Sequence, residues 1–148
     1  MYLLDTNHCS QIIFGNKIIR EKLEQIEEEL IATSVIVAGE LIFMAQNSLY
    51  KDDNLAKVKS FLNDINIYSF NEETIYIYGE LKAKIIDKFG PKEKVKKRKF
   101  TIQNLGISDN DLWIASTVIQ ENLILVSTDK DFLRIKQVHN FCIENWLV

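Results

Sequence analysis

Short apolar runs alternate along this chain with longer segments in which apolar residues recur at helical spacing. The apolar runs predict strands at residues 2–5, 31–33, 65–70, 123–126 and 141–143. The segments at helical spacing predict helices at residues 18–30, 35–44, 52–63, 72–89 and 109–121. Strands that alternate with helices in this way predict an α/β fold with a mainly parallel central sheet between helical layers.

Side chains that can cap a helix precede two of these predicted helices. Ser34 stands before the helix at 35–44, and Asn71 before the helix at 72–89. Gly90 follows the last residue of the second of these helices, where glycine commonly ends a helix. The boundaries of both elements are therefore predicted from side-chain chemistry as well as from periodicity.

Three further segments carry specific expectations. Residues 6–8 are polar and are predicted to be a turn, and a second short turn is predicted at residues 131–133. The helix at 35–44 is apolar nearly all round, which predicts that it is buried, with Glu40 as its polar residue. His8, a lone histidine in the first of these turns, is expected on the polar surface.

The composition is that of one ordinary globular domain. The 148 residues are enough for a single core, so one domain spanning 1–148 is expected, with 47% apolar and 26% charged residues. The formal net charge is −3, so any nucleic-acid contact must come from a local patch. Residues 91–106 contain one such patch, because they begin with the basic run Lys92–Lys99.

The cysteines and the apolar runs bear on the cellular compartment. Cys9 and Cys142 fit neither a zinc-ligand spacing nor a disulfide framework, a pattern typical of reduced proteins. The first residues lack the basic and apolar regions of a secretory leader. No apolar run approaches the roughly 20 residues that a membrane-spanning helix requires. A cytoplasmic protein is expected.

Four acidic residues stand at the ends of strands or on core-forming helices. Asp5 and Asp129 follow apolar strands, Asp111 lies in the first turn of a helix, and Glu40 lies within an apolar helix. Because the carboxyl ends of parallel strands share one edge of a sheet, Asp5, Asp111 and Asp129 are expected to meet there. Carboxylates that lie close together repel each other unless a cation intervenes.

A divalent metal ion is the simplest such cation. Mg²⁺ prefers oxygen ligands, and a metal-bound water can attack phosphorus, so the acids indicate phosphodiester hydrolysis. Each acid has another interpretation when taken alone. Asp5 can cap the next helix or a turn, and Asp109 or Asp111 can be a first-turn helix acid. Asp129 and Asp131 fit a turn equally well. The set of acids, rather than any single one, favours a metal site.

The segments around these acids resemble those of the PIN-domain ribonucleases, specifically the VapC-type toxins of type II bacterial toxin–antitoxin pairs. In chain order the segments are MYLLDTN, AGEL, SDNDLWIAS, LVSTDKDF and ENWL. The resemblance runs over nearly the whole chain and implies a PIN-like, three-layer α/β/α sandwich. It also implies a metal-dependent endoribonuclease that uses Mg²⁺ or Mn²⁺ to cut RNA, a protein antitoxin as partner, and a homodimer.

The resemblance also assigns roles to individual residues. The expected catalytic residues and metal ligands are Asp5, Glu40, Asp111 and Asp129. Asp5 and Asp111 would be the principal ligands, while Asp109 stays possible in place of Asp111. The polar residues expected to orient Asp5 and Asp129 are Asn7, Ser127 and Thr128.

Residues 91–106 depart from the family pattern, which passes more quickly from the long helix to the third acid. One interpretation is a solvated basic loop or insertion. The other is that its cations hold the RNA backbone beside the acidic site and offset the repulsion between that site and phosphate. The cations concerned are Lys94, Lys96, Lys97, Arg98 and Lys99.

Other functions agree less well with the residues. A PIN-like domain that only binds RNA or protein would not need its acids, whereas all four positions here hold Asp or Glu. A phospho-acceptor receiver domain needs paired acids after the first strand, where this chain has only Asp5. A haloacid-dehalogenase phosphatase needs Asp-x-Asp, where this chain has Asp5-Thr6-Asn7. The sequence favours the endoribonuclease, with the non-catalytic PIN-like domain as the alternative.

Overall fold

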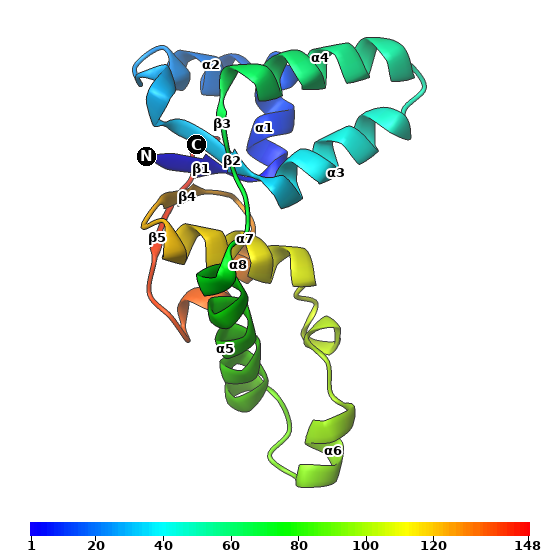
Figure 1. Cartoon of the computed structure of the whole chain (residues 1–148), viewed down its shortest axis with the longest axis vertical. Helices are drawn as coiled ribbons and strands as arrows, with labels where there is room; N and C mark the ends of the chain where they lie inside the picture. Colours follow the sequence, from blue (N-terminus) through cyan, green and yellow to red (C-terminus); the bar gives the residue numbers. More distant parts are fainter. The chain divides into compact units, whose positions relative to one another are not determined.

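The computed structural model describes residues 1–148, except for the side chain of Glu29 (Figure 1). The chain divides into two compact units. The first unit comprises residues 1–69, 123–128 and 142–148, and the second comprises residues 70–122 and 129–141. No helix of the described residues is both long and apolar enough to cross a membrane.

A parallel sheet forms the centre of the first unit. Its strands are β1 (Tyr2–Leu4), β2 (Ile31–Ser34), β3 (Asn66–Tyr68), β4 (Ile124–Val126) and β5 (Cys142–Glu144). Their order is β3-β2-β1-β4-β5, and every neighbouring pair is parallel. Leu3 of β1 pairs with Ala32 on one side and Leu125 on the other, and all three side chains are buried. The predicted α/β class with a mainly parallel sheet is confirmed.

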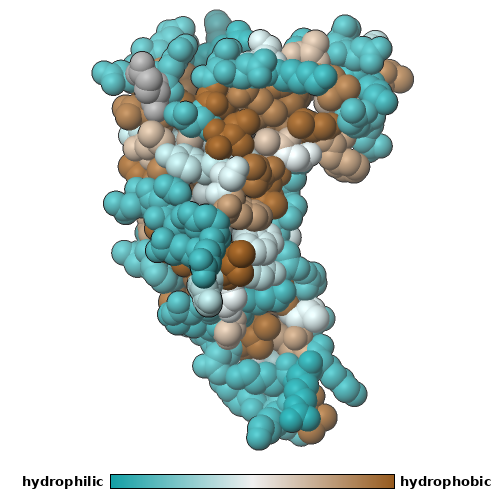
Figure 2. Space-filling model, in the orientation of Figure 1, coloured by the Kyte–Doolittle hydropathy of each residue, from teal (hydrophilic) through white to brown (hydrophobic). Residues whose placement is uncertain are grey.

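Helices complete the first unit. They are α1 (Thr6–Ile13), α2 (Lys17–Leu23), the 3₁₀ helix η1 (Glu28–Leu30), α3 (Val35–Gln46) and α4 (Lys51–Asp64). A short turn joins α3 to α4, so that the two form a helical hairpin, and α1 contacts both (Figure 1). Hydrophilic residues cover the outer side of α4, and hydrophobic residues gather between α4 and α3 (Figure 2). Ser34 caps α3 as predicted, accepting a hydrogen bond from the backbone N–H of Val37 at 3.3 Å.

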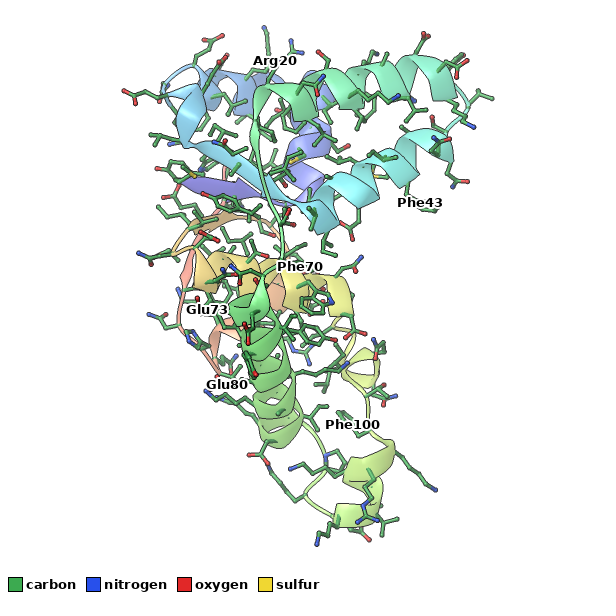
Figure 3. All side chains as sticks on the ribbon, viewed as in Figure 1. Arg20, Phe43, Phe70, Glu73, Glu80 and Phe100 are labelled. Atoms are coloured by element: carbon green, nitrogen blue, oxygen red, sulfur yellow. The ribbon has the colours of Figure 1, made fainter. Side chains whose placement is uncertain are left out.

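Three predictions for the first unit were wrong. The polar turn expected at residues 6–8 is the first turn of α1, because Asp5 caps a helix directly after β1. The helix expected at 18–30 ends at Leu23, where Glu24 and the acids after it put negative charge at the unfavourable end of the helix dipole. Helix α3 is not buried all round: Phe43 is 65% exposed and projects on the side away from α4 (Figure 3).

The second unit is helical. It contains α5 (Glu72–Phe89), α6 (Lys94–Lys99), the 3₁₀ helix η2 (Ile102–Leu105), α7 (Asp109–Gln120) and α8 (Lys130–Lys136). Helix α7 packs against both α5 and α8 (Figure 1). Asn71 caps α5 as predicted, through a capping box with Thr74. The Trp113 ring stacks between Phe70 and Tyr78, with ring centroids 4.5 Å and 3.7 Å away.

Two segments of the second unit are more ordered than expected. Residues 91–106, predicted as a loop, contain α6 and η2. An ion pair of 2.7 Å from Lys97 to Asp87 of α5 holds α6, and the Phe100 ring lies against Gly90 (Figure 3). The turn expected at 131–133 is part of α8, because Asp129 caps that helix. Lysine and arginine are good helix formers, so the basic run forms a helix once its ends are held.

Two glycines of the second unit give a matched test of this packing. An added Cβ at Gly79, within α5, meets nothing within 4 Å, so Gly79→Ala should stabilise the helix by about 0.8–1 kcal/mol. An added Cβ at Gly90 would lie 2.4 Å from the carbonyl oxygen of Ile86, so Gly90→Ala should destabilise the protein. Thermal unfolding should show Gly79→Ala above the wild type and Gly90→Ala below it. Equal melting temperatures would contradict this account.

Candidate metal centre

Asp5 stands at the junction between β1 and α1. Its backbone N–H donates to the carbonyl oxygen of Val126 at 3.1 Å, which ties this end of β1 to the end of β4. Its Oδ1 accepts a hydrogen bond from the backbone N–H of His8 at 2.8 Å and caps α1. The residue is only 6% exposed. The capping role that the sequence allowed for Asp5 is therefore present, and it uses one of the two carboxylate oxygens.

His8 lies in a different place from the one expected. The sequence placed it on the polar surface, but its side chain is completely buried. Its ring Nδ1 lies 2.9 Å from Oδ1 of Asp5. The expectation was wrong because residues 6–8 belong to α1, whose third residue turns back toward the helix cap.

Glu40 lies on α3 and is linked to the first residue of α1. The Thr6 hydroxyl donates a hydrogen bond to Oε2 of Glu40. Since Thr6 follows Asp5 directly, this hydrogen bond links Glu40, in the second turn of α3, to the junction where β1 passes into α1. The structure therefore places two of the four predicted acids on neighbouring elements of the first unit.

Of the predicted supporting residues, Ser127 and Thr128 directly follow β4, and Asn7 lies in the first turn of α1. The Asn7 side-chain amide donates to Oγ1 of Thr128 at 3.3 Å, which joins the start of α1 to the segment after β4. Ser127 is buried, and its backbone N–H donates to the carbonyl oxygen of Glu144 at 2.9 Å. Asn7 thus contacts Thr128, and its effect on Asp5 stays a prediction.

Three carboxylates come together in the second unit. Asp111, Asp129 and Asp131 each offer an oxygen atom, and these atoms all lie within 4.8 Å of one another. Asp111 comes from the first turn of α7, while Asp129 caps α8 through a 2.9 Å bond from the Asp131 backbone N–H. Asp131 was not predicted as a ligand. Its spacing from Asp129, with one residue between them at a helix start, was the available signal and was interpreted as a turn.

The charges in this group oppose one another. Burial raises the pKa of the Asp111 carboxyl, hydrogen bonds from Ser108 lower it, and the negative charges of Asp129 and Asp131 raise it further. The set offers oxygen ligands alone, which suits Mg²⁺ or Mn²⁺ and not a thiolate-preferring metal. A divalent cation at these three carboxylates would remove their mutual repulsion.

Asp109 has different partners, although it lies only two residues before Asp111. Its carboxylate accepts hydrogen bonds from the Tyr78 hydroxyl, from Lys82 Nζ at 2.9 Å and from Gln103 Nε2 at 2.8 Å. Tyr78 and Lys82 hold the pKa of the Asp109 carboxyl below its ordinary value. Of the two candidate ligands on α7, the structure brings Asp111 to the acidic group and uses Asp109 to anchor α7 to α5.

Comparisons with known proteins agree on one family, the PIN domain family. The family model described as PIN domain matches residues 2–138. "Ribonuclease VapC2" of Rickettsia felis is 33% identical over 151 residues, covering 99% of this chain and 98% of its own. "tRNA(fMet)-specific endonuclease VapC" of Salmonella typhimurium is 26% identical, covering 98% of this chain and 97% of its own.

Solved structures give the same result for the fold. The chain resembles one described as "Crystal structure of VapBC2 from Rickettsia felis bound to a DNA fragment from their promoter", with a TM-score of 0.75, 31% identity and 98% of each chain covered. It also resembles VapBC-1 from nontypeable Haemophilus influenzae, with a TM-score of 0.75, 26% identity, and 99% and 98% covered. The predicted α/β/α fold class is confirmed.

Asp109 and Asp111 should affect stability in opposite directions. The folded-state pKa of Asp109 is lowered, so its charge stabilises the protein above the unfolded-state pKa, and this is lost as the pH falls through the folded-state value. The folded-state pKa of Asp111 is raised, so its charge destabilises the metal-free protein at neutral pH. In EDTA at neutral pH, Asp109→Asn should lower the melting temperature and Asp111→Asn should raise it.

The measurement is thermal unfolding of both variants across pH. A difference of 1 kcal/mol corresponds to about 2–4 °C for a chain of this size. The Asp111 difference should shrink as the pH falls through its raised folded-state pKa toward about pH 4, whereas the Asp109 difference should persist to about pH 4 and shrink only below it. The Asp111 carboxylate accepts a hydrogen bond from the Ser108 backbone N–H at 3.2 Å, and the amide oxygen introduced by Asp111→Asn can still accept it, so the helix cap is retained. A lower melting temperature for Asp111→Asn would contradict the account of repulsion.

Proposed function

Since the chain belongs to the PIN domain family, we propose that it is a metal-dependent endoribonuclease and the toxin of a toxin–antitoxin pair. Its relatives named ribonuclease or endonuclease VapC align over nearly their whole length, and they support nuclease activity. The observation that carries the proposal is the group of Asp111, Asp129 and Asp131, whose carboxylate oxygens lie within 4.8 Å of one another. Carboxylates gathered in this way favour a bound divalent cation.

The metal would be Mg²⁺ or Mn²⁺. We assign its binding to Asp111 and Asp129, with Asp131 as a further ligand, and assign Asp5 and Glu40 of the first unit to the same reaction. A bound ion of this kind lowers the pKa of a coordinated water and neutralises charge on the phosphate. The contribution of the chain is to hold carboxylates in fixed orientations: Asp5 and Asp129 each use Oδ1 to cap a helix, which restricts their rotation.

The remaining partners follow from the relatives. The matching solved structures include VapBC complexes from Rickettsia felis, Salmonella typhimurium and Haemophilus influenzae. Because this chain is similar to the VapC chains of those structures, we propose that it binds a cognate antitoxin. We also propose that it forms a homodimer and acts in the cytoplasm. The alternative, a PIN-like domain that binds without cutting, is disfavoured because Asp5, Glu40 and Asp111 are all retained as acids, as is Asp129.

Removal of the metal or of a ligand should abolish RNA cleavage. Purified protein incubated with total RNA should cut it with Mg²⁺ or Mn²⁺ and not with EDTA. Asp5→Asn and Asp111→Asn should each lose more than the roughly 10–100-fold that is typical of residues that only support a ligand. Asp53→Asn, an exposed acid on α4, is the matched control and should cut normally. Cleavage in EDTA, or full activity in both site variants, would reject the proposal.

The basic helix α6 supplies a candidate contact for the RNA backbone. Two of its cations already have intramolecular partners, since Lys97 pairs with Asp87 at 2.7 Å and Lys96 pairs with Glu93 at 3.3 Å. Lys94, Arg98 and Lys99 are exposed, and the described residues provide no ion pair for them. We propose that these three cations contact phosphate, and that Lys96 and Lys97 contribute less because they hold α6 in place.

Reversal of these three charges should weaken RNA binding in a salt-dependent way. Lys94→Glu, Arg98→Glu and Lys99→Glu together, in an Asp111→Asn background that prevents cleavage, should reduce the salt slope of binding by about 0.7 per lost phosphate contact. The matched control reverses the exposed Lys51, Lys57 and Lys59 of α4, which changes the net charge equally. The same slope in both triple variants would show that α6 does not bind the backbone.

A further inference from the structure

We propose that His8 is a positioning residue for Asp5: it holds Oδ1 of the carboxylate so that Oδ2 is presented to the metal. This inference rests on the proposed metal-dependent reaction and concerns how one of its ligands is oriented. Two donors of the same residue converge on the same oxygen, the backbone N–H at 2.8 Å and the ring Nδ1 at 2.9 Å. His8 therefore fixes Asp5 from two directions.

The hydrogen-bonding chemistry determines the tautomer of the ring. An ionised carboxylate only accepts hydrogen bonds. In the contact with such a carboxylate, Nδ1 of His8 is the protonated ring nitrogen and donates the hydrogen bond to Asp5. Oδ1 of Asp5 then has two donors, while Oδ2 has none among the described residues and is not one of their buried, unpaired atoms. The carboxylate thus has one oxygen occupied by the protein and one accessible to a ligand.

The burial of His8 is hard to explain by packing alone. The side chain is completely buried, and its Nε2 has no hydrogen-bond partner. A buried polar atom without a partner destabilises a fold, and an apolar side chain of similar size would avoid that cost. Among the described residues the one polar contact of the ring is with Asp5. A role in holding Asp5 accounts for a histidine at this position.

Two substitutions separate this role from a structural one. His8→Leu keeps most of the side-chain volume and removes the donor, whereas His8→Asn keeps a side-chain N–H donor near the position of Nδ1 and loses volume. If His8 orients Asp5, His8→Leu should weaken Mn²⁺ binding by about 10-fold, in the range typical of residues that orient metal ligands. His8→Asn should bind Mn²⁺ close to the wild-type affinity.

Thermal stability should rank the two variants in the opposite order to Mn²⁺ affinity, with His8→Leu more stable than His8→Asn. In EDTA, His8→Leu should unfold at or above the wild-type temperature, because it removes the unpaired Nε2. His8→Asn should unfold at a lower temperature, because it leaves a cavity in the core. The experiment measures Mn²⁺ binding by the electron paramagnetic resonance signal of the free ion, and unfolding by circular dichroism, on the full chain.

Each outcome decides one point. Wild-type Mn²⁺ affinity in His8→Leu would overturn the positioning role and leave the proposed function intact. Metal binding that weakens in both variants, in step with their stability, would show a structural role and would also overturn it. Asp5→Asn is the reference: if it binds Mn²⁺ as the wild type does, Asp5 is not a ligand, and its part in the proposed function fails independently of His8.

Discussion

The parallel pairing of β1 with β2 and β4 is the constraint that positions Asp5 within the first unit. Neighbouring parallel strands end at the same edge of a sheet, so α1 and α3, which directly follow β1 and β2, begin at the same edge of the first unit's sheet. Asp5 caps α1 after β1, Ser34 caps α3 after β2, and Asp129 caps α8 three residues after β4. In two of these junctions the capping side chain is also a candidate metal ligand. A carboxylate suits both capping and metal binding. One of its oxygens can accept a hydrogen bond from the helix N–H, which fixes the orientation of the group, and the other oxygen can bind a metal.

This arrangement sets stability against function. Asp111, Asp129 and Asp131 lie close enough to repel, and burial adds to the cost of keeping Asp111 ionised. Thr6, which bonds Glu40, and His8, which bonds Asp5, bring polar groups into or beside the core. Such groups are retained in cores when their hydrogen bonds are satisfied or when the site needs them. By the role proposed for it, His8 belongs to the second case: its Nδ1 contacts Asp5, while its Nε2 stays buried without a partner at a cost in stability.

Helix α7 shows how one short segment serves two tasks. Residues two apart on a helix point about 200° apart, so Asp109 and Asp111 face different neighbours. Asp109 meets Lys82 and Tyr78 of α5, where it is a structural anchor, and Asp111 meets the acids at the start of α8. The stacked ring of Trp113 adds to the same α5–α7 contact. The anchor fixes the first turn of α7, and with it the backbone from which Asp111 extends.

The sequence by itself determined the alternation of strands and helices, the caps at Ser34 and Asn71, and the acids expected to act, because these depend on periodicity and on chemistry within a few residues. Tertiary structure decided what depends on distant partners. Asp131 joins the acidic group because α8 packs on α7, and Asp109 turns to α5 because Tyr78 and Lys82 of that helix donate hydrogen bonds to it. His8 changes from an expected surface residue to a buried one because α1 begins at once after β1. A carboxylate or an imidazole has the same local sequence signal in either setting, and its surroundings are settled only when the chain packs.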